Sequence, residues 1–346
     1  MNTVKKYTGV LAVPFFLFSL FSAPIHASEK IIIDADVGID DAMAILFAIA
    51  SPEIDLLGIT TTYGNATIEN STRNASYLIE RTGLDIPVVQ GAGFPLVIPP
   101  EPPADFVHGL NGLGDIDMPE QAKAPLADIT AAEFIIQQSK LYPNELTLVP
   151  VGRLTNIALA LRLDPTLPSR IKRLVLMGGA FEVTGNVTPV AEANIIGDPH
   201  AADIVFQADW DVVAIGLDVT TKIVVNDHDL KSIEQATPVA GGFIRDFSQF
   251  YLDFYRSNGV TEGFYVHDPA ALLYVIDPQL FTTKTAAIRV ASEGIALGQT
   301  IAAIPPMNER DGDWKAVKLN RFADTVNAEK ARELFLSRLS NVQFVQ

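Results

Sequence analysis

Short apolar runs alternate with amphipathic helical patterns through the first two-thirds of the chain. Continuous apolar runs of this kind are typical of strands in a parallel sheet that helices cover on both faces. We therefore predict an α/β fold, a single domain with a mostly parallel central sheet flanked by helices and a Rossmann-like core. The expected strands are 31–33, 56–62, 146–151, 174–177 and 212–217, and the first two expected helices are 41–50 and 65–81.

The N-terminus has the layout of a secretory signal peptide. Lys5 and Lys6 precede an apolar stretch that is followed by polar residues. The stretch is shorter than the about 20 apolar residues that a transmembrane helix needs, and Pro14 interrupts it. We predict that residues 1–27 are a cleaved signal peptide and that residues 28–346 form one domain, which is periplasmic or secreted. An uncleaved membrane anchor is the alternative.

The net charge and the absence of cysteine limit the kinds of ligand that the chain can bind. The formal net charge of the whole chain is -16, and it becomes -18 when Lys5 and Lys6 leave with the signal peptide. This acidity argues against nucleic acid or an anionic membrane as a partner. The chain has no cysteine, which excludes a disulfide framework, a thiolate metal site and a thiolate nucleophile. We expect a small neutral or cationic ligand.

Four carboxylates follow the first expected strand. They belong to Asp34, Asp36, Asp40 and Asp41, and Gly38 lies between them. Hard cations such as Ca²⁺ bind several oxygen ligands, and a glycine turn can fold several acids toward one point. Open α/β sheets bind ligands at the carboxyl ends of their strands, which is where this cluster falls. The cluster therefore predicts a cation site. The alternative is that Asp40 caps the following helix and Asp41 interacts with its dipole.

Polar side chains also follow later strands. Asn65 comes after the second strand, and Val151 ends the third beside a glycine that lets backbone carbonyls turn toward a ligand. A loop farther on carries Asn186, Glu192 and Asn194, whose amide and carboxylate groups can bind the hydroxyls of a sugar. Simpler interpretations are an N-cap for Asn65, a turn at Asn186 and surface exposure for Glu192.

Two histidines are candidates for function. His267 and Asp268 precede a proline that we expect at the first position of a helix. Asp268 would complete the metal site and His267 would donate a proton near neutral pH, although a simple helix cap is the alternative. His108 lies in a glycine-rich stretch that predicts either a mobile cover over the site or a plain flexible loop. We expect His200 and His228 to be surface residues.

In order along the chain, these motifs resemble the inosine-uridine-preferring nucleoside hydrolases, and the resemblance covers nearly all of residues 28–346. The chain departs from the family pattern at Val37, where proline is usual, and we expect a less rigid turn there. The matching motifs are Asp34-x-Asp36-x-Gly38-x-Asp40-Asp41-Ala42, Gly64-Asn65, His108-Gly109, Gly152-Arg153-Leu154-Thr155-Asn156, Met177-Gly178-Gly179, residues 186–194 and His267-Asp268-Pro269.

The resemblance implies a calcium-dependent hydrolase that splits ribonucleosides into ribose and free base. It implies that Ca²⁺ is bound by Asp36, Asp41, Asp268 and the backbone carbonyl of Val151. In this family Asp36 would be the general base for the attacking water, and His267 would protonate the leaving base. A site rich in carboxylates suits this reaction, because loss of the base leaves positive oxocarbenium character on the ribose.

The resemblance also implies the contacts of the substrate. Broad or inosine-uridine preference is expected from His267, and the family forms homodimers or homotetramers. The residues expected to contact the nucleoside are Asp40, Asn194 and Asp268 at the 2′- and 3′-hydroxyls, Asn186 and Glu192 at the 5′-hydroxyl, Asn65 and Met177 beside the ribose, and His108, Tyr251 and Tyr255 around the base.

Two other functions are compatible with parts of the sequence. A strand that ends in Asp-x-Asp also resembles the haloacid-dehalogenase-like phosphatases, which use magnesium and an aspartyl nucleophile. A non-catalytic protein that binds nucleosides for uptake would need the same sugar-binding groups. The phosphatase would release phosphate from nucleotides, and the binding protein would leave nucleosides intact.

Overall fold

The computed structural model describes residues 1, 3, 28–122, 128–306, 314 and 316–345. The expected signal peptide lies outside the described residues, apart from positions 1 and 3. None of the helices within the described ranges is long and apolar enough to cross a membrane.

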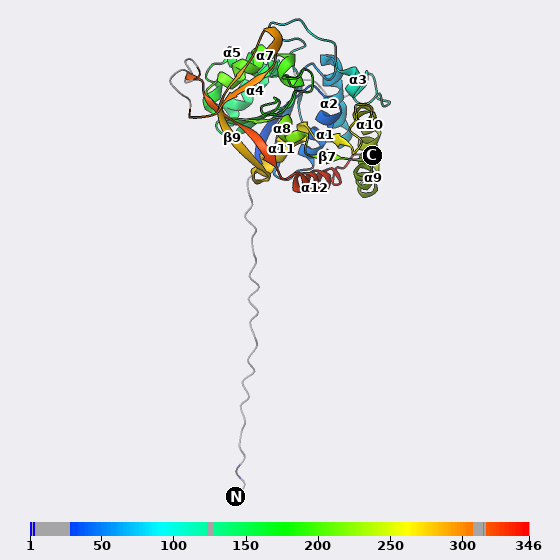
Figure 1. Ribbon diagram of the computed structural model, residues 1–346. Helices are drawn as coiled ribbons and strands as arrows, with labels where there is room; N and C mark the ends of the chain where they lie inside the picture. The colour runs from blue at the N-terminus through cyan, green and yellow to red at the C-terminus, as the bar shows by residue number, and fades with distance from the viewer. Residues whose placement is uncertain (2, 4–27, 123–127, 307–313, 315, 346) are drawn as a thin grey trace.

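A nine-stranded sheet runs through the centre of the molecule, in the order β10-β9-β11-β6-β5-β4-β1-β2-β3 (Figure 1). The seven strands from β11 to β3 are parallel to one another, and β9 and β10 add an antiparallel edge. The expected α/β fold with a mostly parallel sheet is confirmed. The strands are β1 (Glu29–Ala35), β2 (Ile54–Thr61), β3 (Val88–Gln90), β4 (Leu146–Pro150), β5 (Ile171–Met177), β6 (Val212–Ile215), β9 (Phe281–Val290), β10 (Thr300–Ala303) and β11 (Leu319–Val326); β7 (Val224–Val225) and β8 (Phe264–Tyr265) form a separate antiparallel pair.

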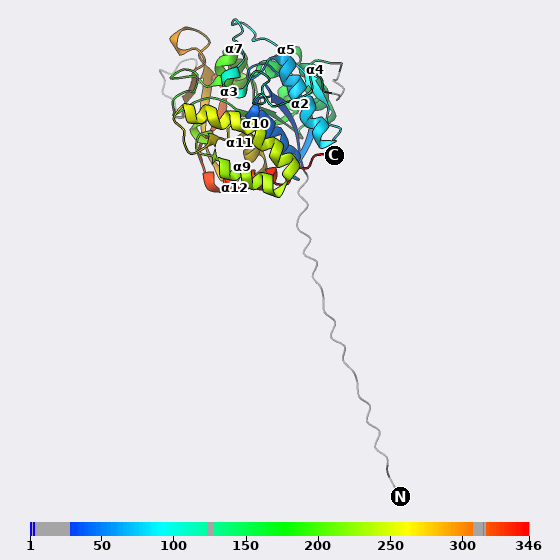
Figure 2. The ribbon, with the colours of Figure 1, turned by 90° about the vertical axis from the view of Figure 1, so that its right-hand side faces the viewer.

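Helices cover both faces of the sheet. Figure 2 shows α9, α10 and α12 grouped at one side of the molecule, with α5 and α7 at the opposite side. The helices are α1 (Ile39–Ile49), α2 (Ile68–Thr82), α3 (Asp105–His108), α4 (Ala131–Leu141), α5 (Thr155–Leu163), α6 (Ala193–Gly197), α7 (Pro199–Gln207), α8 (Leu217–Thr220), α9 (Asp227–Ala236), α10 (Pro238–Ser257), α11 (Asp268–Ile276) and α12 (Ala328–Leu339).

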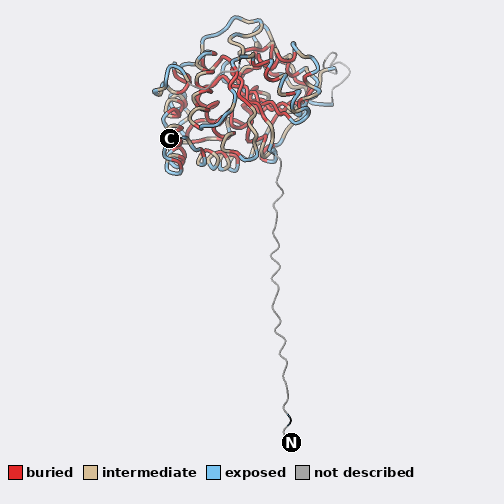
Figure 3. The backbone as a smooth tube through the Cα atoms, turned by 180° about the vertical axis from the view of Figure 1, so that it is seen from behind, coloured by how far each residue is buried: buried red, intermediate tan, exposed pale blue. Residues whose placement is uncertain are grey.

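The isoleucines of β1 explain why the first strand is apolar at successive positions. Ile31 and Ile33 pack into the core that includes α1, α10 and α11, whereas Ile32 packs into the core that includes α4, α5 and α7. Successive side chains of a strand point to opposite faces, so a strand covered on both sides is apolar throughout. Figure 3 shows the buried backbone running through the middle of the molecule.

The helix starts differ from the sequence-based expectations. Helix α1 begins at Ile39, two residues early, and its N-cap is Gly38 rather than Asp40. Helix α2 begins at Ile68 instead of Asn65, because the side chain of Thr67 caps it by accepting from the N–H of Asn70. The N-cap interpretation of Asn65 is therefore wrong. This leaves the Asn65 side chain free to contact the acidic cluster.

Helix α11 begins at Asp268, with His267 in the N-cap position and Pro269 as the second helical residue. Proline thus lies one position later than expected, and the His267 side chain makes no capping hydrogen bond. Val37 is completely buried, and its carbonyl accepts from the amide of Asn74 at 3.0 Å. This contact stabilises the turn in which the family pattern has proline.

Candidate active site

Three carboxylates from distant parts of the chain meet at the carboxyl end of the sheet. Asp40 and Asp41 come from the first turn of α1, and Asp268 is the first residue of α11. One oxygen of each lies within 4.8 Å of the others, and all three residues are buried. The oxygens Asp40 Oδ1 and Asp268 Oδ2 are buried without a hydrogen-bond partner. Buried, unpartnered carboxylate oxygens are costly unless a cation binds them, so these residues fit a divalent metal ion.

Burial and mutual repulsion perturb these acids. Burial raises the pKa of Asp40 to about 7, and the neighbouring Asp36 carboxylate adds to the shift. Burial, together with Asp40 and Asp36, also raises the pKa values of Asp41 and Asp268 well above their usual range. A bound cation would favour the ionised forms instead.

Asp41 and Asp36 are joined through the turn that connects β1 to α1. The carboxylate of Asp41 accepts from the N–H of Gly38 at 2.9 Å and from the N–H of Asp36 at 3.1 Å. Asp41 therefore does stabilise the start of α1, as the alternative interpretation proposed, but it also faces Asp268. The local role and the role in a cation site are compatible, because a carboxylate has about four acceptor positions.

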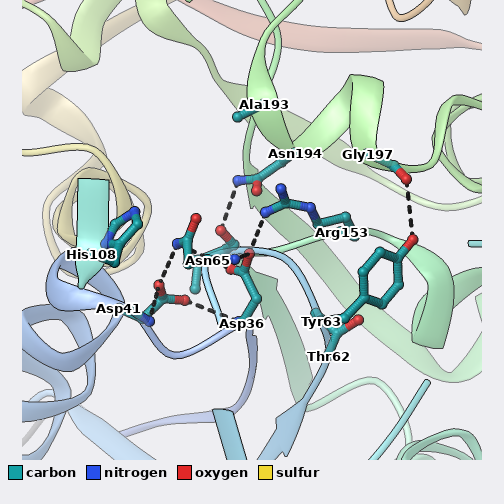
Figure 4. A network of polar contacts seen from close by, with 12 residues as sticks. Asp36, Asp41, Thr62, Tyr63, Asn65, His108, Arg153, Ala193, Asn194 and Gly197 are labelled. Atoms are coloured by element: carbon teal, nitrogen blue, oxygen red, sulfur yellow. Dashed lines mark hydrogen bonds and ion pairs between the residues drawn. The ribbon is translucent and has the colours of Figure 1, made fainter. Parts of the chain in front are cut away.

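Asp36 lies beside the three-acid group and is completely buried. Its carboxylate accepts from the N–H of Asn65 at 2.7 Å and forms an ion pair with Arg153 (Figure 4). The side-chain amide of Asn65 donates to Asp41 Oδ2 at 2.9 Å. Burial raises the pKa of Asp36, and the Arg153 guanidinium opposes that shift. Asn65 thus holds two carboxylates at once, which no local sequence pattern specified.

The end of β4 contributes a backbone oxygen. The carbonyl of Val151 accepts from the amide of Asn194 at 2.7 Å, and that amide also lies 3.2 Å from the carbonyl of Met177. A carbonyl oxygen has two lone pairs, so Val151 retains one for a cation. Asn194 therefore connects the ends of β4 and β5.

Glu192 is 2% exposed, so the simpler interpretation of it as a surface residue is wrong. It is the N-cap of α6, and its carboxylate accepts from the N–H groups of Asn194 and Ile195 at 3.0 and 3.2 Å. Burial raises its pKa. Asn186 closes the preceding loop by accepting from the N–H of Ala193 at 3.0 Å, which agrees with a turn role. Both side chains nevertheless line the pocket described below.

His267 is buried and has a partner on each ring nitrogen. The hydroxyl of Thr220 lies 2.8 Å from Nδ1, and the hydroxyl of Tyr255 lies 2.8 Å from Nε2. Burial lowers the pKa of His267 to about 4, so the ring is neutral at pH 7. A neutral ring fixed in this way can orient the Tyr255 hydroxyl as a hydrogen-bond donor.

His108 ends the short helix α3, is 4% exposed and lies just before the glycine-rich stretch that the sequence predicted as a cover or a loop. Its Nδ1 accepts from the N–H of Ile39 at 3.1 Å, which leaves the proton on Nε2. The ring stacks on Tyr251, with 5.5 Å between the ring centres, and burial lowers its pKa to about 3. Tyr251 in turn donates to Asp40 Oδ2 at 3.1 Å.

A pocket of about 480 Å³ opens above these groups. Every residue that the resemblance placed in contact with substrate lines it, and so does His267. Its volume is in the range of small-molecule sites. Asp36, Asp41 and Val151 lie deeper and do not line it. His200 is half-buried and His228 is exposed, and neither lines this pocket.

Three residues of this region were not predicted from the sequence as site residues. They are Arg153, Thr220 and Tyr265. Arg153 and Tyr265 line the pocket, and Thr220 contacts His267. Thr220 follows β6, and the carboxyl ends of parallel strands are where ligands bind, so its position was a usable signal.

A parallel-sheet domain with a buried acid cluster under a pocket at the carboxyl ends of its strands is an arrangement that suits a metal-dependent hydrolase. Residues 31–333 match the family described as inosine-uridine preferring nucleoside hydrolase, and the chain belongs to that family. It is therefore a hydrolase that acts on N-glycosyl compounds. This membership favours nucleoside hydrolysis over the phosphatase and the non-catalytic binding protein.

Named relatives agree with this assignment. The chain is 43% identical to uridine nucleosidase 1 of Arabidopsis thaliana over 79% of this chain and 81% of that protein. It is 40% identical to the inosine-uridine preferring nucleoside hydrolase of Crithidia fasciculata over 84% of this chain and 93% of that protein. Among solved structures, it is similar to the plant nucleoside hydrolase PpNRh1, with a TM-score of 0.87 and 39% identity over 90% of this chain and 99% of the other.

Proposed function

We propose that this hydrolase requires Ca²⁺ and cleaves the N-glycosidic bond of ribonucleosides, with a broad or inosine-uridine preference. The observation that carries the proposal is the meeting of Asp41 and Asp268 with Asp40 in a buried group under a pocket of suitable size. The named relatives act on uridine or prefer inosine and uridine, which supports the substrate class.

The metal would be held by the carboxylates of Asp36, Asp41 and Asp268 and by the carbonyl of Val151. All of these are oxygen ligands, which suits calcium better than a softer transition metal. When bound, the ion supplies positive charge that orients ribose hydroxyls and acidifies water.

Residues of the chain itself would deprotonate the attacking water and bind the ribose. Asp36 accepts the proton of the attacking water, and Asn65 keeps its carboxylate in place. Asp40, Asn194 and Asp268 hold the 2′- and 3′-hydroxyls, and Asn186 and Glu192 hold the 5′-hydroxyl. The carboxylates stabilise the positive charge that develops on the ribose. Met177 packs beside the sugar.

The leaving base needs a hydrogen bond as its bond to ribose breaks. With Thr220 donating to Nδ1, the Nε2–H of His267 donates to the Tyr255 oxygen, and the Tyr255 hydroxyl can then donate to the base. Because the low pKa of His267 keeps it neutral at pH 7, the pair supplies a hydrogen bond rather than a ready proton. His108 and Tyr251 complete the surroundings of the base.

The test is release of reducing sugar from a panel of nucleosides by the mature protein, with and without chelator. Activity that a chelator abolishes and calcium restores is expected. Full activity after complete metal removal would contradict the calcium requirement. Phosphate release from nucleotides without sugar release would contradict the reaction itself.

We also propose that the protein is exported to the periplasm or the cell exterior and acts there as a homodimer or homotetramer. The lysine-led apolar segment at the N-terminus supports export. N-terminal sequencing of the protein from the extracytoplasmic fraction tests cleavage near residue 27. Light scattering of the mature protein tests the oligomeric state.

A further inference from the structure

Arg153 brings a permanent positive charge into the acidic site. Of the described residues that line the pocket, it is the single lysine or arginine. Its side chain is 12% exposed and forms an ion pair with the fully buried Asp36. Its Nε is buried and has no hydrogen-bond partner. The guanidinium is therefore held by its ion pair with Asp36 and not by a second contact through Nε.

The backbone leaves room for this side chain at two glycines. Gly64 has φ of +147°, and a Cβ there would overlap both the Arg153 guanidinium and the Asp36 carboxylate. A Cβ at Gly197 would lie 2.5 Å from Arg153 Nε. The hydroxyl of Tyr63 donates to the Gly197 carbonyl at 3.1 Å and so fixes that segment. The Arg153 side chain therefore fills a space that the two glycines leave open, and its position is fixed by the surrounding backbone.

The charges show what Arg153 can and cannot do. The buried acids at this site are Asp36, Asp40, Asp41, Asp268 and Glu192, and one guanidinium cannot balance them. The excess of carboxylates also disfavours a phosphate or other anionic group on the substrate, so the arginine is not explained as an anion site. What remains is its direct contact with Asp36, which is one of the residues expected to bind the metal.

We propose that Arg153 sets the affinity of the cation site by sharing Asp36 with the bound ion. A fixed positive charge beside the site repels a divalent cation and occupies one of its carboxylates, so it weakens binding. Arg153 is a positioning residue in this account, because it acts through Asp36. The inference rests on the calcium requirement proposed above and adds the residue that lowers the affinity for the ion.

Isothermal titration of the metal-free protein with calcium chloride at pH 8 tests the proposal, because few protons compete for the acids at that pH. Arg153→Met keeps an unbranched apolar side chain and removes the charge, and it should bind calcium roughly ten-fold more tightly or better. Arg153→Lys keeps the charge and should bind with nearly the wild-type affinity. Arg162→Met changes the net charge equally at an exposed position of α5 and should leave the affinity unchanged.

A purely structural role for Arg153 predicts that the lysine and methionine variants weaken binding alike, and that result would overturn the proposal. So would an unchanged or weaker affinity in Arg153→Met while the wild type binds calcium. If the wild type itself binds no calcium, the proposed metal requirement falls together with this inference. Arg153→Gln, which is also uncharged, takes the place of the methionine variant if circular dichroism shows that the latter does not fold.

Discussion

Without its cation, this protein should become less stable as the pH rises from 5 to 7. The reason is the set of buried acids whose pKa values are raised by burial, which outnumber the two buried histidines that act in the opposite direction. The acids are Asp34, Asp36, Asp40, Asp41, Glu192 and Asp268, and the histidines are His108 and His267. In the unfolded chain the aspartates lose their protons near their usual value of 3.8. Between that pH and the raised value, the folded state holds protons that the unfolded state has released. The free energy of unfolding is therefore greatest below the pKa of the unfolded chain. It falls as the pH rises from that value to the raised pKa of the folded protein.

Asp34 gives the size of the effect for one residue. Burial raises its pKa to about 7, although the Thr60 hydroxyl and the Asn156 amide donate to Oδ1 at 2.6 and 2.7 Å. One raised carboxyl lowers the free energy of unfolding by up to about 1.4 kcal/mol per pH unit, or by roughly 2 kcal/mol between pH 5 and 7 because the group is half ionised at its own pKa. Asp41 and Asp268 act in the same direction. Bound calcium should remove much of the pH dependence that Asp41 and Asp268 cause, because it favours the ionised forms of both carboxyls.

Urea unfolding followed by circular dichroism measures this effect at pH 5, 6 and 7, with chelator or with excess calcium. Asp268→Asn removes one raised carboxyl and should flatten the pH dependence of the chelated protein. Asp324→Asn is the control, because a hydrogen bond from Thr282 lowers the pKa of Asp324, so its removal should not flatten the curve. A chelated wild type that is equally stable or more stable at pH 7 than at pH 5 would refute the reasoning.

Three further outcomes are expected. Asp36→Ala should lower the rate of ribose release by a factor of about 10² to 10⁴, which is the usual contribution of a general base. Its circular dichroism spectrum should be unchanged. Full activity in the sugar assay would exclude Asp36 from the mechanism. Tyr255→Phe leaves Nε2 of His267 without its partner and should lower kcat more than it changes KM, whereas an equal kcat in steady-state kinetics would exclude a role in the departure of the base. Gly64→Ala should lower the free energy of unfolding by about 1–3 kcal/mol, because strain and overlap combine there. Gly259→Ala has a positive φ but nothing within 4 Å and should lose less in the same urea titration; equal losses would mean that backbone strain alone is responsible.

Local sequence was sufficient for the five strands β1, β2, β4, β5 and β6, but β3, β9, β10 and β11 were not expected. The side chains of β1 alternate between two cores, so the strand had to be apolar at consecutive positions, and that pattern was readable without any long-range information. The position of the acidic cluster was also predictable, because parallel strands bring their carboxyl ends to one edge. The helix starts were less predictable. Asn65 and Thr67 are both suitable N-caps, and only the contacts of Asn65 with Asp36 and Asp41 decide between them.

The sequence by itself determined the α/β class, five strands of the sheet and the acids at the first strand end, because hydrophobic periodicity is a local property. Only the tertiary structure decided that Asp268 meets Asp41, that Arg153 pairs with Asp36 and that Thr220 holds His267. These partners are far apart in the chain. Asp268 meets Asp41 because α11 packs against α1, and Arg153 meets Asp36 because β4 pairs with β1. A side chain's partner across such a distance depends on how whole helices pack, and no short sequence pattern contains that information.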